Sequence, residues 1–135
     1  MALSVKPLEL AFTSLCRAVA RFEQDRTDLE VRDACIQRFE YTYELSIKII
    51  KRYLEQEMSL AERIDQLNYR DLIRIAHEVN LIKEVTSWFV YREARNQTSH
   101  TYDEKKAAEV YSVIQPFIVD TQELLNTLAD RLEKT

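Results

Sequence analysis

The sequence predicts an all-α protein: an up-and-down antiparallel four-helix bundle with one short extra helix. The chain contains no glycine and only two prolines, which disfavours the tight hairpins that connect antiparallel strands. In several long stretches, apolar residues recur at steps of three and four, the spacing of a buried helix face. The length of 135 residues suits one domain with a substantial core, so we expect a single bundle over residues 1–135.

The overall charge limits how this protein could meet nucleic acid. The formal net charge is -4 and the isoelectric point is about 5.3, so bulk attraction to a polyanion is excluded and any contact with RNA or a nucleotide must be local. No apolar run is long enough for a membrane span and no signal-peptide pattern opens the chain, so we expect a cytoplasmic protein. Cys16 and Cys35 stand singly in helical patterns, which predicts reduced core thiols and no metal site.

The first two helices have clear periodicity. The first is expected over about residues 3–24, with its apolar face at Leu8, Phe12, Leu15, Val19 and Phe22. Thr27 and Glu30 have the spacing of a capping box, which predicts that the second helix starts there. Apolar residues keep helical spacing from Ile36 to Leu54, so this second helix is long enough for a bundle.

The second half of the chain predicts three further segments. Ser59 and Glu62 form a second capping box before a short segment of weaker pattern, and a helix is expected over residues 69–79, with Asn80 as a left-handed C-cap. His77 should be a half-buried residue of that helix. Another helix is expected over residues 81–97. Thr101 and Glu104 form a third capping box, so the last helix should begin at residue 102 and continue to about residue 132, with its internal proline as a candidate kink.

The junction between the last two helices, "REARNQTSHTYDE", contains the one cluster suited to chemistry. On a continuous helix, Arg95 and His100 would lie roughly 140° apart, but a turn between them brings Arg95, His100 and Tyr102 to one end of the bundle. Histidine moves protons near neutral pH, arginine stabilises phosphoryl charge, Asn96 could orient either group, and Tyr102 offers a modifiable hydroxyl. A site just before a helix start would also favour an anion. The alternative is an ordinary polar junction of caps and surface residues.

The residues of this junction resemble a known family. "RNQTSHTY" at residues 95–102 is similar to the R-x-x-x-x-H-x-Y signature of the HEPN superfamily, specifically of the nucleotidyltransferase substrate-binding proteins encoded beside minimal nucleotidyltransferases. The resemblance extends to "RDACIQRFEYTYEL" at residues 32–45 and to "YDEKKAAEVY" at residues 102–111. It covers roughly residues 32–132.

The resemblance implies a homodimer whose two motifs meet in a shared cleft that receives RNA or a nucleotide. Arg95 and His100 map onto the metal-independent ribonuclease site of the toxin members, which use no cofactor. Tyr102 maps onto the tyrosine that the nucleotidyltransferase antitoxin adenylylates, and Asn96, next to Arg95, would have a supporting role. Adenylylation of Tyr102 would place a phosphoester near Arg95 and neutralise the charge that RNA needs.

Two other functions remain open on the sequence alone. The chain could be a non-catalytic subunit that presents a nucleotide or another substrate to the nucleotidyltransferase, or a helical dimerisation module without a ligand. The second helix carries more aromatic surface than one core face needs, at Phe39, Tyr41 and Tyr43, which suggests a protein partner. Tyrosines at the edge of a bundle would give the same pattern without a partner. Asn80, where many relatives have glycine, and Ile47, where many have an aromatic residue, depart from the family without touching the signature.

Overall fold

The computed structural model describes residues 3–57, 64 and 66–133, and all the regular structure in them is helical. The prediction of an all-α fold is confirmed. The elements are α1 (Lys6–Gln24), α2 (Leu29–Glu57), α4 (Tyr69–Glu78), α5 (Val85–Gln97), the 3₁₀ turn η1 (Thr98–His100) and α6 (Glu104–Glu133).

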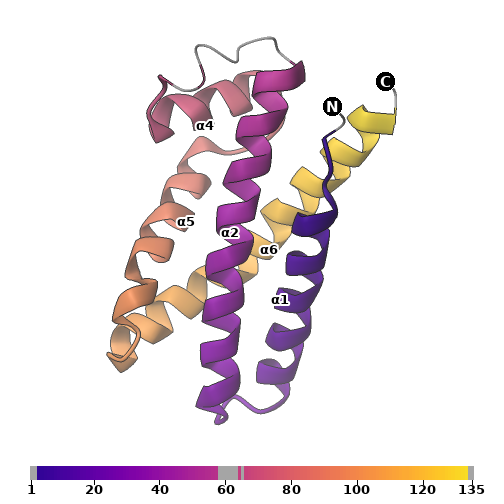
Figure 1. The fold of residues 1–135 in the computed structure, drawn as a ribbon. Coiled ribbons are helices and arrows are strands. Elements are labelled where there is room, and N and C mark those ends of the chain that lie inside the picture. The colour runs from indigo at the N-terminus through magenta and orange to yellow at the C-terminus, as the bar shows by residue number, and fades with distance from the viewer. Residues whose placement is uncertain (1–2, 58–63, 65, 134–135) are drawn as a thin grey trace.

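The four long helices α1, α2, α5 and α6 form an up-and-down bundle (Figure 1). Each runs opposite to the one before it, and α6 crosses behind α2 at an angle on its way back to the end that holds both termini. The short α4 lies at that same end, beside α5 and the last part of α2. The turn that links α5 to α6 therefore lies at the opposite end, near the start of α2.

Aromatic side chains join three of these helices in the core. Phe117 of α6 meets Phe39 of α2 edge to face at 4.9 Å between ring centroids, and Tyr91 of α5 at 5.3 Å. Trp88 packs on Tyr91 at 5.3 Å, and it is 1% exposed. Burying each such ring stabilises the fold by roughly 1.5–3 kcal/mol, so this cluster fixes how α5 sits against α2 and α6.

The start of α2 corrects the first predicted capping box. α2 begins at Leu29, and the carboxylate of Asp28 accepts a hydrogen bond from the backbone N–H of Val31 at 3.2 Å. Thr27 instead donates its hydroxyl to Asp25 Oδ1 at 2.5 Å. The Thr27–Glu30 prediction was wrong because an aspartate one residue closer to the helix serves as the cap. The box predicted at Ser59 and Glu62 lies outside the described residues.

The connection between α4 and α5 is longer than predicted. Asn80 has φ 61°, and the N–H groups of Asn80 and Leu81 bond back to the carbonyls of His77 and Ala76, so the predicted left-handed C-cap is confirmed. α5, however, begins at Val85 instead of residue 81. Leu81 and Ile82 are buried residues of the connection between the two helices. Their apolar side chains fitted the pattern of a helix face, which explains why the helix start was predicted too early.

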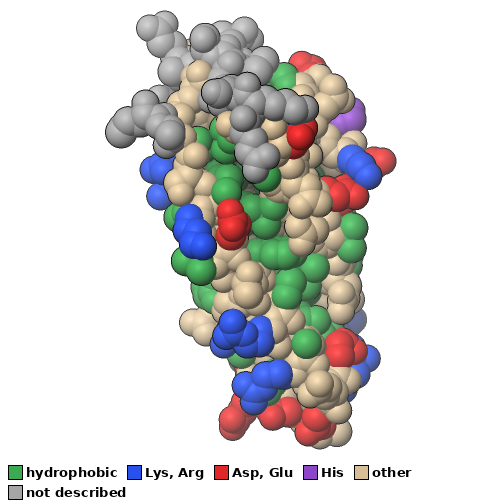
Figure 2. Space-filling model, turned by 90° about the vertical axis from the view of Figure 1, so that its right-hand side faces the viewer, with side chains coloured by type: hydrophobic (Ala, Val, Ile, Leu, Met, Phe, Trp, Pro, Cys, Tyr) green, Lys and Arg blue, Asp and Glu red, His purple; other side chains and the backbone are tan. Residues whose placement is uncertain are grey.

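Some apolar side chains remain at the surface. Among the described residues the exposed large ones are Leu10, Leu29, Tyr41, Val90, Tyr102 and Val119. Hydrophobic side chains are also visible down the middle of the face shown in Figure 2. Of the three aromatic residues considered for a partner surface, Phe39 and Tyr43 are buried in the core and only Tyr41 is exposed, at 37%. No helix within the described residues is both long and apolar enough to cross a bilayer.

Candidate functional site

The predicted junction exists as a tight turn at one end of the bundle. α5 ends at Gln97, and η1 reverses the chain before α6 begins. The hydroxyl of Thr98 lies 2.8 Å from the carbonyl oxygen of Arg95 and 2.6 Å from Glu40 Oε2 on α2, and Thr101 donates to the carbonyl of Thr98 at 3.1 Å. These bonds fix the turn on α2, so Arg95 and His100 belong to one small region.

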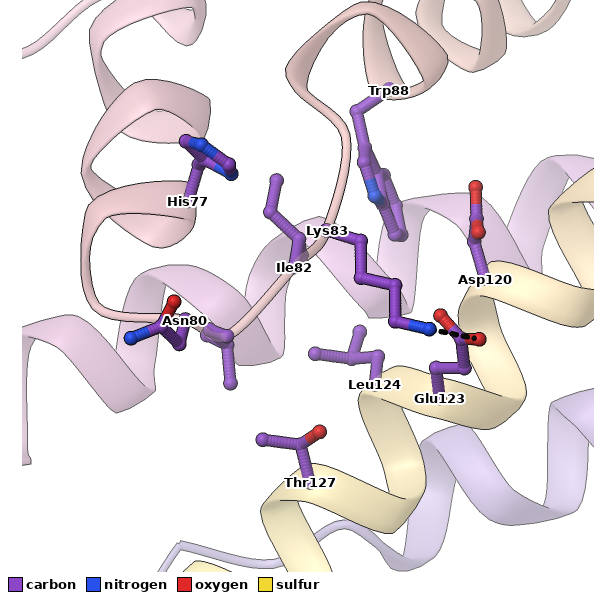
Figure 3. A pocket seen from close by; sticks show the side chains of 10 residues that line it. His77, Asn80, Ile82, Lys83, Trp88, Asp120, Glu123, Leu124 and Thr127 are labelled. Carbon is purple, nitrogen blue, oxygen red and sulfur yellow. Dashed lines mark hydrogen bonds and ion pairs between the residues drawn. The ribbon is translucent and has the colours of Figure 1, made fainter.

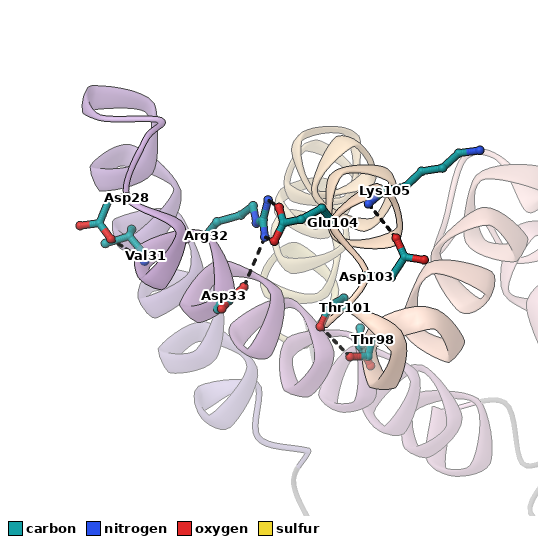
Figure 4. Close-up of polar contacts among 9 residues, drawn as sticks. All are labelled: Asp28, Val31, Arg32, Asp33, Thr98, Thr101, Asp103, Glu104 and Lys105. Carbon is teal, nitrogen blue, oxygen red and sulfur yellow. Dashed lines mark hydrogen bonds and ion pairs between the residues drawn. The ribbon is translucent and has the colours of Figure 1, made fainter.

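The start of α6 differs from the prediction in two ways. Asp103, not Thr101, caps the helix: its Oδ1 accepts from the N–H groups of Lys105 at 2.9 Å and Lys106 at 3.4 Å (Figure 4). The helix begins at Glu104 instead of residue 102. The carboxylate of Asp103 thus already accepts from the N–H groups at this helix start, so an anion that binds beside His100 would have to compete with it.

Glu104 pairs with α2 instead of completing a capping box. Its two carboxylate oxygens accept from Arg32 Nη1 at 2.9 Å and Nη2 at 3.2 Å, a bidentate contact across the bundle end (Figure 4). Hydrogen bonding to Arg32 lowers the pKa of Glu104, and the same contact raises the pKa of Arg32. The pair holds the first turn of α6, and with it the segment carrying His100 and Tyr102, against α2.

Arg95 is held by two carboxylates of α2 that lie outside the R-x-x-x-x-H-x-Y signature. Its Nε and Nη2 donate to Glu44 Oε1 at 3.0 and 2.5 Å, and Nη1 lies 3.7 Å from Glu40 Oε2. The hydrogen bond to Glu44 raises the pKa of Arg95, with smaller contributions from both negative charges. Sequence reasoning missed both acids. Glu40 and Glu44 stand one turn apart on α2, and that four-residue spacing was the available signal.

His100 and Tyr102 are open to solvent. The side chain of Tyr102 is 86% exposed, and its ring lies edge to face with that of His100 at 6.4 Å between centroids. Within the described part of the chain, no hydrogen bond or ion pair joins His100 to Arg95. An anion in solvent would therefore reach His100 freely but would have to compete with Glu44 for Arg95.

Asn96 faces a different part of the surface from Arg95. It lines a pocket of about 270 Å³ between α4 and α5, which we call the α4–α5 pocket. Its lining residues are Tyr69, Arg70, Phe89, Arg92, Glu93 and Asn96. The structure thus separates Asn96 from the arginine that precedes it in the motif.

His77 proves to be exposed, so the prediction of a half-buried residue was wrong. It stands at the end of α4 and lines a pocket of about 370 Å³ between the α4–α5 connection and α6 (Figure 3). The charged groups of this pocket already have partners, because Lys83 pairs with Glu123 at 3.0 Å and Tyr91 donates to Asp120. The pocket lies at the start of α5, whereas the junction follows the end of that helix.

Other candidate chemical groups are structural. Cys35 is buried, and burial raises the pKa of its thiol to about 11, so it stays protonated; Cys16 is half-buried, and both thiols are free, as predicted. No three His, Cys, Asp or Glu side chains in the described ranges are grouped so that they could hold a metal ion.

Comparison with known proteins identifies what this arrangement resembles. Residues 3–130 match the protein family described as "Nucleotidyltransferase substrate binding protein like". A curated protein of Haemophilus influenzae, named "Probable ribonuclease HepT", is 36% identical over 96% of this chain and 94% of its own length.

Two solved structures have the same fold. One, from Haemophilus influenzae, was described as revealing the fold of a substrate-binding domain of a nucleotidyltransferase; it superposes with a TM-score of 0.86 at 35% identity, over 93% of this chain and 99% of that one. The other, from Thermus thermophilus, gives a TM-score of 0.74 at 28% identity, over 90% and 98%. The family match and the close relative confirm the resemblance: this chain belongs to the HEPN-type family of nucleotidyltransferase substrate-binding proteins.

Proposed function

We propose that this protein is an endoribonuclease that cuts RNA without a metal ion, with His100 and Arg95 as its catalytic residues. The observation that carries the proposal is the nearly full-length similarity to a probable ribonuclease, in a chain with an arginine in the last turn of α5 and an exposed histidine in the tight turn that follows. A homodimer in which two such turns face each other would supply two histidines and two arginines to one cleft.

The chemistry needs only proton transfer and charge stabilisation. The ribose 2′-oxygen attacks phosphorus, and the P–O5′ bond breaks to leave a 2′,3′-cyclic phosphate and a 5′-hydroxyl. One histidine accepts the 2′-hydroxyl proton and the partner copy's equivalent donates a proton to the leaving oxygen. Arg95 exchanges Glu44 for a phosphate oxygen and stabilises the charge of the transition state.

The test uses purified protein and RNA in EDTA. We expect cleavage products ending in a cyclic phosphate, and we expect the His100→Ala variant to lose cleavage while keeping its helical circular dichroism. His77→Ala is the matched control, because His77 is also exposed but lies on α4, at the end of the bundle opposite the junction. Equal cleavage by the His100→Ala protein would refute the assignment.

Tyr102 is proposed as the point at which a partner nucleotidyltransferase controls the enzyme. Its high exposure suits modification: the phenol oxygen attacks the α-phosphorus of ATP, pyrophosphate leaves, and a base of the transferase takes the phenol proton. Intact mass after co-expression should show one AMP added to the wild type and to the control Tyr41→Phe, and none to Tyr102→Phe. Modification that persists in Tyr102→Phe would contradict this role.

The family description favours one competing function, a subunit that presents a substrate to the nucleotidyltransferase without cutting RNA. That function predicts a stable complex and nucleotide binding, with no RNA cleavage by the free protein. Together with the ribonuclease activity, we propose that the protein is the toxin of a toxin–antitoxin pair, that it forms a homodimer and that it is cytoplasmic. Sedimentation that shows only monomer at micromolar concentration would count against the shared cleft.

A further inference from the structure

The α4–α5 pocket combines two arginines with two aromatic rings. The guanidinium carbon of Arg92 lies 4.5 Å from the ring centroid of Tyr69, and that of Arg70 lies 5.0 Å from the centroid of Phe89. The two rings themselves are 6.2 Å apart. Tyr69 is anchored because its hydroxyl donates to the carbonyl oxygen of Trp88 at 2.9 Å. The rings thus form a fixed base for the two cations.

Stacking prepares these arginines for an anion. A guanidinium that lies over a ring has its plane fixed, while its N–H groups point outward along its edges and remain able to donate. Among the described residues, neither Arg70 nor Arg92 forms an ion pair, and both side chains are exposed. The edges of both cations are therefore available for phosphate oxygens.

The local charge differs from that of the whole molecule. The chain carries a formal net charge of -4, yet the residues that line this pocket include two arginines and one carboxylate, Glu93. Glu93 is itself engaged, since its Oε1 accepts from Gln97 Nε2 at 3.0 Å. A small positive site of this kind is the local contact that an acidic protein needs in order to bind a polyanion.

The pocket also adjoins the catalytic turn. Phe89, Arg92 and Asn96 follow each other at steps of three and four, so they share one face of α5. Arg95 comes one turn after Arg92, about 4.5 Å further along the helix axis and about 60° around it. A strand lying along α5 could contact the pocket and the motif together.

We infer that the α4–α5 pocket is the subsite for a nucleotide that flanks the cleaved bond of single-stranded RNA. Arg70 and Arg92 bind its phosphate, its base stacks on the guanidinium and aromatic layer, and the amide of Asn96 is placed to hydrogen-bond the base edge. The inference rests on the proposed RNA substrate and extends it from the cutting residues to a second contact.

The experiment measures binding separately from cleavage. A labelled single-stranded RNA of about 12 nucleotides is titrated by fluorescence anisotropy into the His100→Ala protein, in EDTA and over a series of salt concentrations. When Arg92→Ala or Arg70→Ala is introduced into the His100→Ala protein, its affinity for the RNA should fall roughly tenfold. Each should also reduce the slope of log affinity against log salt by about 0.7, the value for one lost phosphate contact on a single strand.

Two matched variants separate this site from general charge effects. Arg17→Ala removes one exposed positive charge from α1 and should leave affinity and salt slope unchanged. Arg92→Lys keeps the charge but loses the planar stack, so it should keep the salt slope and recover only part of the affinity. If Arg17→Ala reduced RNA affinity as much as Arg92→Ala does, the proposed subsite would be refuted.

The outcomes distinguish the subsite from the ribonuclease itself. If the wild type does not cut RNA but binds it through Arg70 and Arg92, the ribonuclease proposal fails, and the pocket stands as a site that binds single-stranded RNA without a cleaved bond beside it. Cleavage and binding that are unaffected in Arg70→Ala and Arg92→Ala would refute the subsite alone. A loss of nucleotidyltransferase binding in these variants, with RNA binding intact, would assign the pocket to the protein partner and refute it as well.

Discussion

Two neighbouring faces of α5 carry arginines in opposite settings. Arg95, on the face toward α2, is held by the carboxylates of Glu40 and Glu44, whereas Arg92 lies over the ring of Tyr69 and forms no ion pair with the described residues. Arg95, which belongs to the signature, is thus already paired with carboxylates. Arg92, which does not belong to it, has N–H groups available for an anion. The comparison shows that side chains on one helix can be set up differently, and under the proposed function Arg92 would bind RNA while Arg95 stabilises the transition state.

The largest expected effect tests this difference directly, by replacing each of the two arginines with alanine in turn. Arg95→Ala should lower kcat for RNA cleavage roughly 100- to 1000-fold, because it removes a donor that acts on transition-state charge. Arg92→Ala should raise KM about tenfold and leave kcat nearly unchanged at saturating RNA, since it removes binding that is equal in ground and transition states.

Steady-state cleavage of one oligonucleotide by both variants measures this contrast. Circular dichroism serves as the check that both variants are folded, and Arg17→Ala again controls for charge. Equal losses of kcat in the two variants would show that the two faces of α5 do not have separate roles in binding and catalysis.

A smaller effect is expected from the carboxylates. Glu44→Gln should raise RNA affinity about threefold, because an uncharged amide competes less well than a carboxylate for Arg95. Glu93→Gln should give a similar rise, because it removes the one acid among the residues lining the α4–α5 pocket and keeps a partner for Gln97.

Anisotropy titrations at low salt check these two variants together. The gain should shrink at high salt, because added ions screen both carboxylates. A weaker affinity for RNA in Glu44→Gln would mean that Glu44 helps to bind RNA instead of competing with it.

The smallest effect concerns the bridge that holds the turn. The pKa of Glu104 is lower in the folded protein than its ordinary value of 4.5, so its pairing with Arg32 stabilises the fold above that pH and is lost as the pH falls through the lowered value. Glu104→Gln should therefore lower Tm slightly at pH 7 and by less at pH 3. The Glu104 side chain is 68% exposed, so the shift is expected to be small.

Thermal unfolding at both pH values tests the bridge, with Glu109→Gln as the control on the same helix. Glu109 is exposed, and its side chain forms no contact with Arg32. A Glu104→Gln effect that is the same at both pH values would mean that packing, and not charge, holds the turn.

Sequence patterns were reliable where one local rule decided the outcome. The absence of glycine and the apolar periodicity predicted the helices, and Asn80 in the left-handed conformation followed from the same absence. The capping boxes failed at Thr27 and Thr101 because Asp28 and Asp103 lie nearer the helix starts. A spacing rule alone cannot decide between two acceptable caps.

The candidate site was predictable in place but not in its contacts. The capping pattern at Thr101 and Glu104 located the turn correctly, although Asp103 proved to be the cap. The pairing of Arg95 with Glu44 and of Arg32 with Glu104 depends on how α2 packs, over separations of 51 and 72 residues. Likewise, the α4–α5 pocket exists only because the packed bundle brings Tyr69 under Arg92.

The pairing of Arg95 with Glu44 has a consequence for which ligands can inhibit the protein. A free phosphate or a mononucleotide must displace the carboxylate from dilute solution. A strand already held at Arg92 presents its next phosphate at a high effective concentration, so the same exchange becomes favourable. Inhibition by oligonucleotides should therefore increase steeply with length, and the cell's abundant small phosphates should leave the site unoccupied.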